Sequence, residues 1–268
     1  MLVAHDVQVA IRVLGRFEVT RDGIPVPDTE WQSRKARELL KILVARRGRA
    51  CPRGRLVELL WPDEDDPAVL SNRLSVALAT VRRILDPART NQFLITEGGS
   101  VALHRVDVDV ETFLRDATEG LRTRSGVLLR RATALYRGDV LEEDLYADWS
   151  HDLREEARAV CLAALRALAA DTTDPDEAVL LLLRLLEQDR YDEPAHLALI
   201  SVLLPAGRWG EADRAHRRYR SRMAEIGIEP AAVPGLPRRP RVRRPGGGSP
   251  LTLPPPVPAG LRRSPGTW

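Results

Sequence analysis

Seven side chains between residues 72 and 83 could bind duplex DNA if they lie on one helix. At 3.6 residues per turn, one side of that helix would be small, polar and basic, and it would carry no carboxylate. Side chains of this kind are what a reader of the major groove needs. The alternative is an ordinary amphipathic helix whose arginines lie in water. The residues on this side are Asn72, Val76, Ala79 and Arg83, with Thr80 just beside them and Arg73 and Arg82 on the two flanks.

The residues from 66 to 86 carry the signals that would form this helix. An apolar stripe recurs at helical spacing on the opposite side, which predicts that this opposite side is buried. Asp66 is a suitable N-cap, Pro67 suits the first helical position, and Asp86-Pro87 ends the helix. The stripe consists of Leu70, Leu74, Leu78, Val81 and Leu85. The sequence therefore predicts a helix over residues 67–85.

Strands and two further helices are predicted before this helix. Period-two alternation over residues 9–26, with a turn at Asp22-Gly23, predicts three short antiparallel strands. Ser33 is a predicted N-cap for a helix that continues to Gly48, and a second helix is predicted over residues 53–60 after a short extended piece near residue 51. The first turn of the former helix is basic, with Arg34, Lys35 and Arg37. These cations either meet an acidic group or are solvated.

A short acidic loop and a hairpin complete the N-terminal pattern. Residues 61–66, WPDEDD, connect the second helix to the third, and a hairpin over residues 93–104 is predicted to turn at Gly98-Gly99. Three helices followed by a β-hairpin form a winged helix-turn-helix, in which the third helix is the recognition helix. The N-terminal strands are typical of response-regulator output domains. We therefore expect an α+β winged helix-turn-helix domain over residues 1–105.

After residue 105 the pattern is nearly all helical. Ala178 and Ala212 are 34 residues apart, the tetratricopeptide period, and each begins the second helix of a pair. Pro205 removes a backbone donor, so the helix before Gly207 is predicted to end early. The predicted helices are 110–123, 126–136, 149–170, 174–188, 194–204 and 209–225. An all-α, tetratricopeptide-like domain is expected over residues 106–233.

The last segment, residues 234–268, is rich in proline and glycine and poor in large apolar residues, so we expect it to be disordered. Residues 238–244 hold five arginines. They form either a solvated basic tail or an arm that binds phosphates nonspecifically.

Composition and motifs exclude several classes of protein. The net charge of +3 implies no general affinity for polyanions, and Cys51 and Cys161 have no metal or redox spacing. With neither a membrane span nor a secretion signal, we expect a cytoplasmic protein. The acidic residues 63–66 have no His or Cys nearby, and the five histidines are isolated, so neither a metal site nor an active site is predicted. We expect neither a cofactor nor enzymatic activity.

Several stretches carry a resemblance to a known family. Residues 11–15 (IRVLG), 34–44 (RKARELLKILV), 53–66 (RGRLVELLWPDEDD) and 72–85 (NRLSVALATVRRIL) resemble the DNA-binding domain of the Streptomyces antibiotic regulatory proteins. Residues 106–114 (VDVDVETFL), 136–149 (YRGDVLEEDLYADW) and 153–160 (LREEARAV) are similar to the bacterial transcriptional activator domain that follows it in that family. The resemblance covers residues 9–233.

The resemblance implies a cytoplasmic transcription activator that binds promoter repeats and recruits RNA polymerase. It places the seven residues named first on DNA: Arg73 and Arg82 at phosphates, and the other five toward the groove. It also suggests that the acidic loop, with Asp63, Glu64 and Asp65, faces the polymerase. The helical repeats would contact polymerase or form a homodimer.

Two departures from the family pattern leave an alternative open. Many related winged helices carry arginines where this chain has Ala79 and Thr80, and their wings end in an aromatic and a basic residue where it has Val101-Ala102. Recognition could therefore depend mainly on DNA shape. The alternative function is a helical-repeat adaptor whose degenerate winged helix binds protein.

Overall fold

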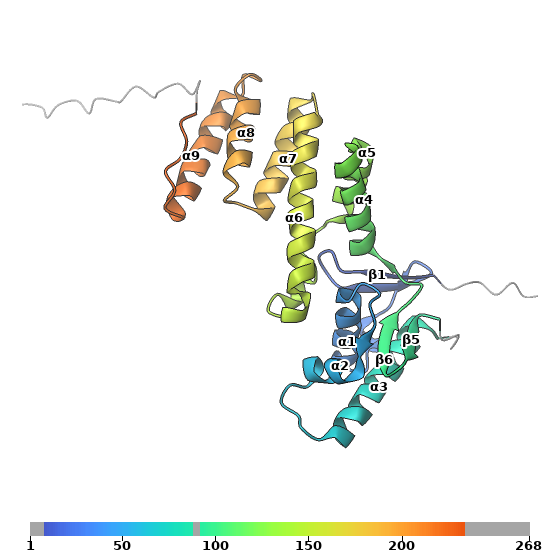
Figure 1. Ribbon diagram of the computed structural model, residues 1–268. Coiled ribbons are helices and arrows are strands. Elements are labelled where there is room, and N and C mark those ends of the chain that lie inside the picture. The colour runs from blue at the N-terminus through green and yellow to red at the C-terminus, as the bar shows by residue number, and fades with distance from the viewer. Residues whose placement is uncertain (1–7, 88–91, 234–268) are drawn as a thin grey trace, which may run out of the picture. The chain divides into compact units, whose positions relative to one another are not determined.

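The computed structural model describes residues 8–87 and 92–233 (Figure 1). The predicted disordered tail over residues 234–268, including the arginines of residues 238–244, lies outside the described residues.

The N-terminal strands form because alternate residues are apolar. β1 (Val9–Arg12) pairs antiparallel with β2 (Glu18–Arg21), which pairs antiparallel with β3 (Ile24–Pro25). Val9 and Ile11 point into the core and are at most 1% exposed. The three predicted antiparallel strands are confirmed. A fourth strand, β7 (Asp107–Val108), was not predicted and pairs parallel with β1 on its other side.

The predicted winged helix is confirmed. α1 (Arg34–Ala45) is capped by Ser33, whose Oγ accepts a hydrogen bond from the Lys35 amide at 3.2 Å. After a short 3₁₀ turn (Asp28–Glu30) and α1, the chain continues as β4 (Cys51–Pro52), α2 (Arg53–Leu60), α3 (Pro67–Leu85), β5 (Leu94–Glu97) and β6 (Ser100–Leu103). The order β4-β6-β5 makes a second small sheet, and α1 packs against both α2 and α3.

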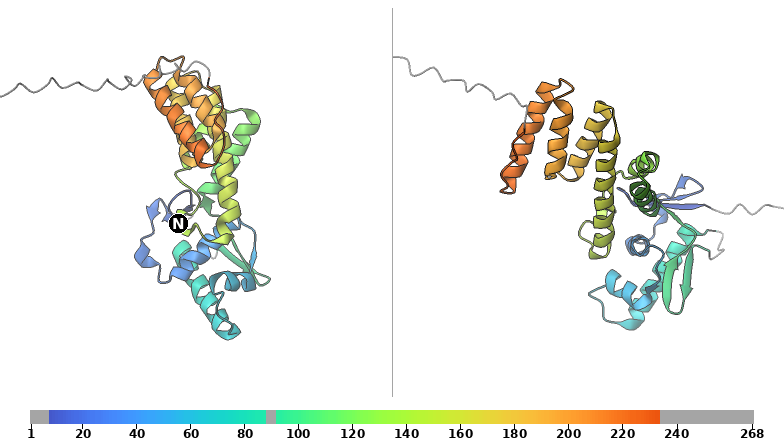
Figure 2. Two further views of the ribbon diagram at one scale, coloured as in Figure 1. Left: turned by 90° about the vertical axis from the view of Figure 1, so that its left-hand side faces the viewer. Right: turned by 45° about the horizontal axis from the view of Figure 1, so that its top comes forward.

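Six α-helices follow between residues 109 and 225 of the described chain, each within one residue of its predicted bounds. They are α4 (Asp109–Thr123), α5 (Gly126–Leu135), α6 (Asp148–Asp171), α7 (Pro175–Gln188), α8 (Glu193–Leu203) and α9 (Trp209–Glu225). From α6 onward each helix packs against the next (Figures 1 and 2). Ala178 and Ala212 are both buried, as small residues must be where paired helices cross closely. The early end of α8, two residues before Pro205, is also confirmed.

Residues 137–147 connect α5 to α6 within the helical domain and contact the winged helix. We call them the joint segment. Leu14 and Val140 form a β-bridge, and the Gly15 amide donates to the Asp139 carbonyl at 3.0 Å. A short 3₁₀ turn (Glu142–Asp144) lies within the segment. Backbone hydrogen bonds of this kind satisfy polar groups that would otherwise be buried without partners.

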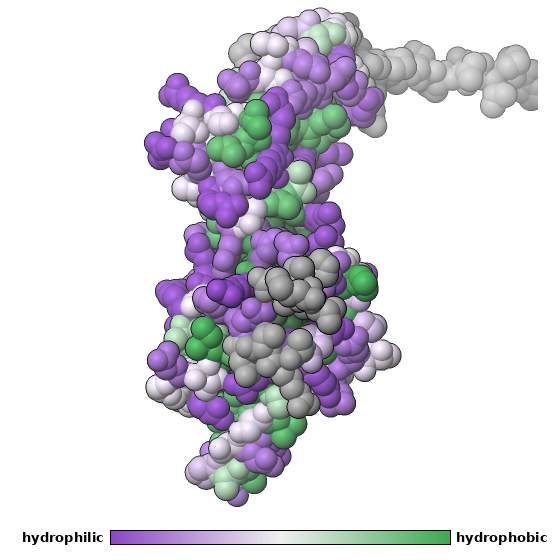
Figure 3. Space-filling model, turned by 90° about the vertical axis from the view of Figure 1, so that its right-hand side faces the viewer, coloured by the Kyte–Doolittle hydropathy of each residue, from purple (hydrophilic) through white to green (hydrophobic). Residues whose placement is uncertain are grey.

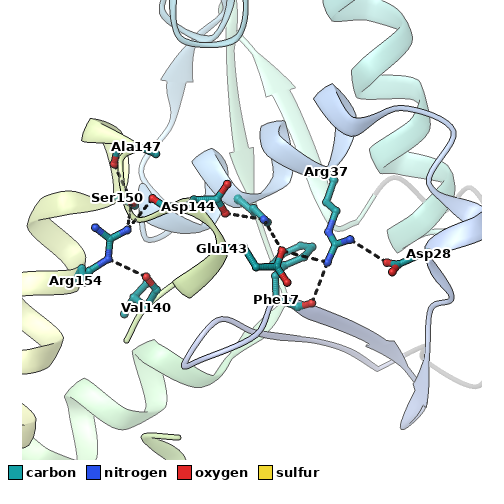
Figure 4. A network of polar contacts seen from close by, with 10 residues as sticks. Phe17, Asp28, Arg37, Val140, Glu143, Asp144, Ala147, Ser150 and Arg154 are labelled. Carbon is teal, nitrogen blue, oxygen red and sulfur yellow. Dashed lines mark hydrogen bonds and ion pairs between the residues drawn. The ribbon is translucent and has the colours of Figure 1, made fainter. Parts of the chain in front are cut away.

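Arg154 of α6 binds the joint segment through hydrogen bonds to its backbone (Figure 4). Its guanidinium donates to the carbonyls of Val140, Leu145 and Asp144 at 2.9–3.1 Å, and also to Ser150 Oγ at 2.7 Å. The residue is 5% exposed, so these bonds compensate for the desolvation of its charge.

Lys41 and Arg37 of α1 bind the same segment from the winged-helix side. Figure 4 shows Arg37 beside Glu143. The Lys41 ammonium lies 2.6 Å from Asp144 and 3.2 Å from Glu143, and Arg37 lies 3.6 Å from Glu143. Arg37 also pairs with Asp28 at 2.9 Å. Two cations of the basic first turn of α1 therefore meet acidic groups of the chain itself: Arg37, and Lys35, which pairs with Glu38 at 2.9 Å.

Within the described residues, no helix is both long and apolar enough to cross a membrane. On the face of the molecule drawn in Figure 3, hydrophobic side chains form separate patches among hydrophilic ones.

We predict that Arg154→Ala lowers the free energy of unfolding by about 3 kcal/mol, because one buried and two partly buried carbonyls lose their donor. Urea unfolding followed by circular dichroism measures this change. Arg122→Ala is the control, since Arg122 forms an exposed ion pair with Glu119 and should leave the midpoint unchanged. Equal effects of the two substitutions would contradict the structural role of Arg154.

Candidate nucleic-acid interface

The start of α3 is fixed by the cap that the sequence predicts. Asp66 accepts hydrogen bonds from the amides of Ala68 and Val69 at 2.8 and 3.3 Å, and Pro67 occupies the first helical position. These contacts set the position of α3 relative to the loop before it. The bounds predicted for this helix, residues 67–85, are confirmed.

The inner side of α3 is apolar and buried against the rest of the winged helix. Four of the five stripe residues are buried, and Leu70, near the helix start, is half-buried. Ala77 and Ile84 extend the buried side beyond the predicted stripe. This burial keeps the opposite side of α3 facing outward.

The outer side of α3 carries most of the predicted DNA-facing residues. Asn72, Arg73, Ala79 and Arg83 are exposed, and Val76 is 56% exposed. Asn72 and Arg83 can hydrogen-bond to base edges, whereas Val76 and Ala79 offer methyl groups of the kind that contact thymine.

Thr80 is less exposed than these residues but lines the same outer side of α3, so its predicted place toward the groove stays a prediction. Its side chain is 5% exposed because it lies one residue from Val81 and four from Ile84, both of which are fully buried. A helical wheel places Thr80 near the boundary between the two sides, and the packing leaves only a small part of it exposed, toward the hollow on the outer side.

The three arginines of α3 are held by neighbouring elements. Arg82 donates to Thr96 Oγ1 of β5 at 2.6 Å, and Arg83 donates to the Glu30 carbonyl at 3.4 Å. Arg73 pairs with Glu64 at 3.0 Å. Each contact uses part of a guanidinium that has five N–H donors, so donors remain for a ligand.

The acidic loop is less uniform than its sequence suggests. Asp63 and Asp65 are exposed, and no ion pair involves either of them within the described residues. Glu64 is half-buried, and its carboxylate orients Arg73. We therefore separate Glu64 from the two exposed carboxylates.

The wing is a tight hairpin with few groups that could bind DNA. Gly98 and Gly99 both have positive φ, 54° and 76°, as a two-residue turn of type I′ requires. Val101 is fully buried, so its side chain supports the fold instead of facing outward. The lack of a basic wing tip, noted in the sequence, persists in the structure.

Arg53 at the start of α2 was missed by sequence reasoning. Its side chain donates to Ser75 Oγ of α3 at 3.2 Å, and its amide donates to the Gly99 carbonyl at 3.0 Å. Arg53 therefore lies where α2, α3 and the wing meet. The signal that could have identified it is a basic residue in the first turn of the positioning helix.

A hollow of about 640 Å³ lies along the outer side of α3. The α3 residues Val76, Ala79, Thr80, Arg82 and Arg83 line it, together with Gln32 from the segment before α1. Small side chains on α3 create this hollow, and Gln32 adds an amide that can donate to or accept from a base or a phosphate. Within the described residues, no group of His, Cys, Asp and Glu is placed to hold a metal ion.

Comparison with known proteins gives two matching families. Residues 30–100 match the family "Transcriptional regulatory protein, C terminal", and residues 103–233 match the "Bacterial transcriptional activator domain". The first match includes α1, α2 and α3, and the second includes the joint segment and α4 to α9.

Two individual proteins are also similar to this chain. It is 29% identical over 237 residues to the regulatory protein AfsR of Streptomyces coelicolor, which covers 84% of this chain but 23% of that relative. The solved structure of Mycobacterium tuberculosis EmbR in complex with a low affinity phosphopeptide superposes with a TM-score of 0.67 at 22% identity, covering 85% of this chain and 63% of the other. The second likeness shows the fold: a winged helix followed by a helical domain.

We predict that Arg83→Ala weakens binding to the best duplex by about 1–3 kcal/mol and reduces the preference over scrambled DNA. Arg73→Ala should weaken all sequences alike and lower the slope of log affinity against log salt by about 1. Fluorescence anisotropy with duplexes selected from a random pool measures both effects.

Arg115→Ala, on α4, removes an exposed arginine outside the interface and is the matched control. If Arg83→Ala left the preference for the selected duplex intact, Arg83 would not read bases.

Proposed function

This chain belongs to the Streptomyces antibiotic regulatory protein family, and from that premise we propose that it is a DNA-binding transcription activator. It would bind promoter DNA through α3 and recruit RNA polymerase to the bound promoter. Both domains of the family are present in the family's order. Because the chain spans about a quarter of the length of AfsR, we base its activity on its own residues.

One observation carries the proposal: the outer side of α3 is basic, contains small side chains and has no carboxylate. The inner side of the same helix is packed into a complete winged helix, so the outer side is held rigidly. A helix of this kind fits the major groove, where a base-edge code can be read.

The contacts divide by chemistry into two sets. Asn72 and Arg83 would bind base edges, and Val76 and Ala79 would approach thymine methyl groups. Arg73, Arg82 and the newly recognised Arg53 would bind phosphates, which fix the register of the protein without reading sequence. With few long side chains toward the groove, DNA shape would supply part of the specificity.

Activation requires a contact with RNA polymerase in addition to the contact with DNA, and the acidic loop is suited to it. Asp63 and Asp65 are exposed beside the DNA-binding helix, where they would repel phosphates. A basic surface of RNA polymerase would be attracted by the same charges, which mainly speed and orient the encounter. The helical domain would provide further contacts or a homodimer interface.

The remaining features follow from this role. A promoter-binding regulator works in the cytoplasm, where the bacterial chromosome lies, and it needs no catalytic residues. The adaptor alternative is not favoured, because α3 keeps its cap, its buried stripe and its exposed arginines.

We predict that Asp63→Ser/Asp65→Ser preserves or slightly tightens DNA binding but lowers transcription at least about twofold. Transcription in vitro with RNA polymerase, at matched promoter occupancy, measures the effect. Glu64 is left in place because it orients Arg73, and Asp66 because it caps α3.

The control is Asp152→Ser/Glu155→Ser, which removes two exposed carboxylates from α6. Unchanged transcription by the loop variant would show that the loop is solvated surface. Absence of any transcript increase with wild-type protein bound to the promoter would contradict the activator role itself.

A further inference from the structure

Two adjoining hollows open between α7, α8 and α9, far along the chain from the DNA-binding helix. Their volumes are about 460 and 150 Å³, and Leu183, His196 and Arg218 line both of them. We call the two together the arginine groove. Its floor consists of apolar residues and its rim of basic ones. The floor is formed by Leu183, Leu186 and Leu199, and the rim by Arg190, Arg214 and Arg218.

The rim is basic because arginines recur every four residues on α9. Arg214, Arg218 and Arg222 lie on one side of the helix, and like charges at this spacing repel each other. Arg222 is paired with Glu225 at 2.9 Å. Arg214 and Arg218 are exposed, and the described part of the chain contains no ion pair for either. Stabilisation of α9 therefore does not explain why these arginines are present.

The carboxylates near the rim, Glu211 beside Arg214 and Glu225 beside Arg190, neutralise only part of its charge. Glu211 lines the groove but is held by two hydrogen bonds from Arg208, at 2.7 and 2.8 Å. Glu187 is a further acidic residue at the rim. Arg190 comes from the turn that follows α7, and its guanidinium lies over the ring of Tyr191, 4.8 Å from the ring centroid. The groove keeps an excess of positive charge.

The floor is apolar and rigid. Leu186 and Leu199 are 7% and 4% exposed, and the small exposed part of each faces the groove. His196 beneath them is fixed, because its Nε2 lies 3.0 Å from the Arg190 carbonyl and its ring packs 5.6 Å from that of Tyr219. A preformed apolar floor under a charged rim favours an occupant that has apolar side chains as well as charge.

This combination distinguishes between two acidic ligands. A DNA backbone would satisfy the arginines but would leave the leucine floor against sugar and phosphate, where apolar contact gains little. A peptide with acidic residues and leucines satisfies both, because its carboxylates reach the rim while its apolar side chains enter the hollows.

We propose that the arginine groove of α7, α8 and α9 binds an acidic, leucine-containing segment of a partner protein. Arg214, Arg218 and Arg190 pair with its carboxylates, and Leu183, Leu186 and Leu199 contact its apolar side chains. This interaction does not depend on the DNA-binding role, because its residues belong to a different domain from α3.

The test is fluorescence anisotropy of the full chain with a fluorescein-labelled nonapeptide that has leucine at every third position and aspartate or glutamate elsewhere. Wild-type protein is expected to bind it, and R214E/R218E to bind at least about tenfold more weakly. R220E is the control for a charge reversal on the same helix, since Arg220 is an exposed arginine of α9 that does not line the groove. It is expected to bind within about twofold of wild type.

Three further measurements complete the test. Peptides with lysine in place of the acids, or serine in place of the leucines, are expected to bind at least about tenfold more weakly. All variants are expected to keep their affinity for the selected DNA duplex, so failure of this proposal and failure of the DNA-binding proposal are distinguishable.

The proposal is overturned if wild type does not bind the acidic peptide, or if R220E loses binding as R214E/R218E does. Displacement of the peptide by duplex DNA as the tighter ligand would assign the groove to nucleic acid. Sedimentation equilibrium that shows self-association lost in R214E/R218E would assign it to a second copy of the chain. Either result overturns the proposal.

Discussion

The joint segment between the two domains depends on one buried arginine. Arg154 donates four hydrogen bonds, three of them to carbonyls that have left regular secondary structure between α5 and α6. Without that donor the Val140 carbonyl would be buried without a partner, which is costly, and the two partly buried carbonyls would lose theirs as well. With it, Val140 is held in place to bridge Leu14 of the winged helix. The orientation of the helical domain against α1 follows from this contact, and α1 in turn packs on α3.

Charge at the joint is balanced between the two domains. Lys41 is 5% exposed and is the only side chain of α1 that is both charged and buried, which is tolerable because Glu143 and Asp144 surround its ammonium. Asp109 completes the contact from α4, where its carboxylate accepts from the amides of Val13 and Leu14 at 2.9 and 3.2 Å. Burial raises the pKa of Asp109, although these amide hydrogen bonds act in the opposite direction. An acid with a raised folded-state pKa contributes stability at low pH that is lost as pH rises through that pKa.

Local signals predicted the helices well, and long-range contacts account for what was missed. α3 could be placed because its cap, its proline and its leucine spacing all lie within 21 residues, from Asp66 to Asp86. β7 has two residues, and its partner β1 lies almost a hundred positions away, so no local pattern reveals it. Lys41 is a polar residue whose burial is set by partners 102 and 103 positions away. Thr80 lies at the boundary of a helical wheel, where the surrounding packing decides which side it joins.

The central claim is that α3 lies in the major groove of DNA, and a tethered cleavage reagent tests it most directly. Cys51 and Cys161 are fully buried, and burial raises the pKa of both thiols, to about 12 for Cys161, so neither should react with the reagent. Val76→Cys then provides one reactive thiol for iron–EDTA on the outer side of α3, and Leu180→Cys, exposed on α7, provides the control. We expect the reagent at position 76 to cleave the selected duplex at one position within the bound site, and the reagent at position 180 to leave that site uncut. Cleavage from position 180 alone, or none from position 76 while the duplex is bound, would contradict the account.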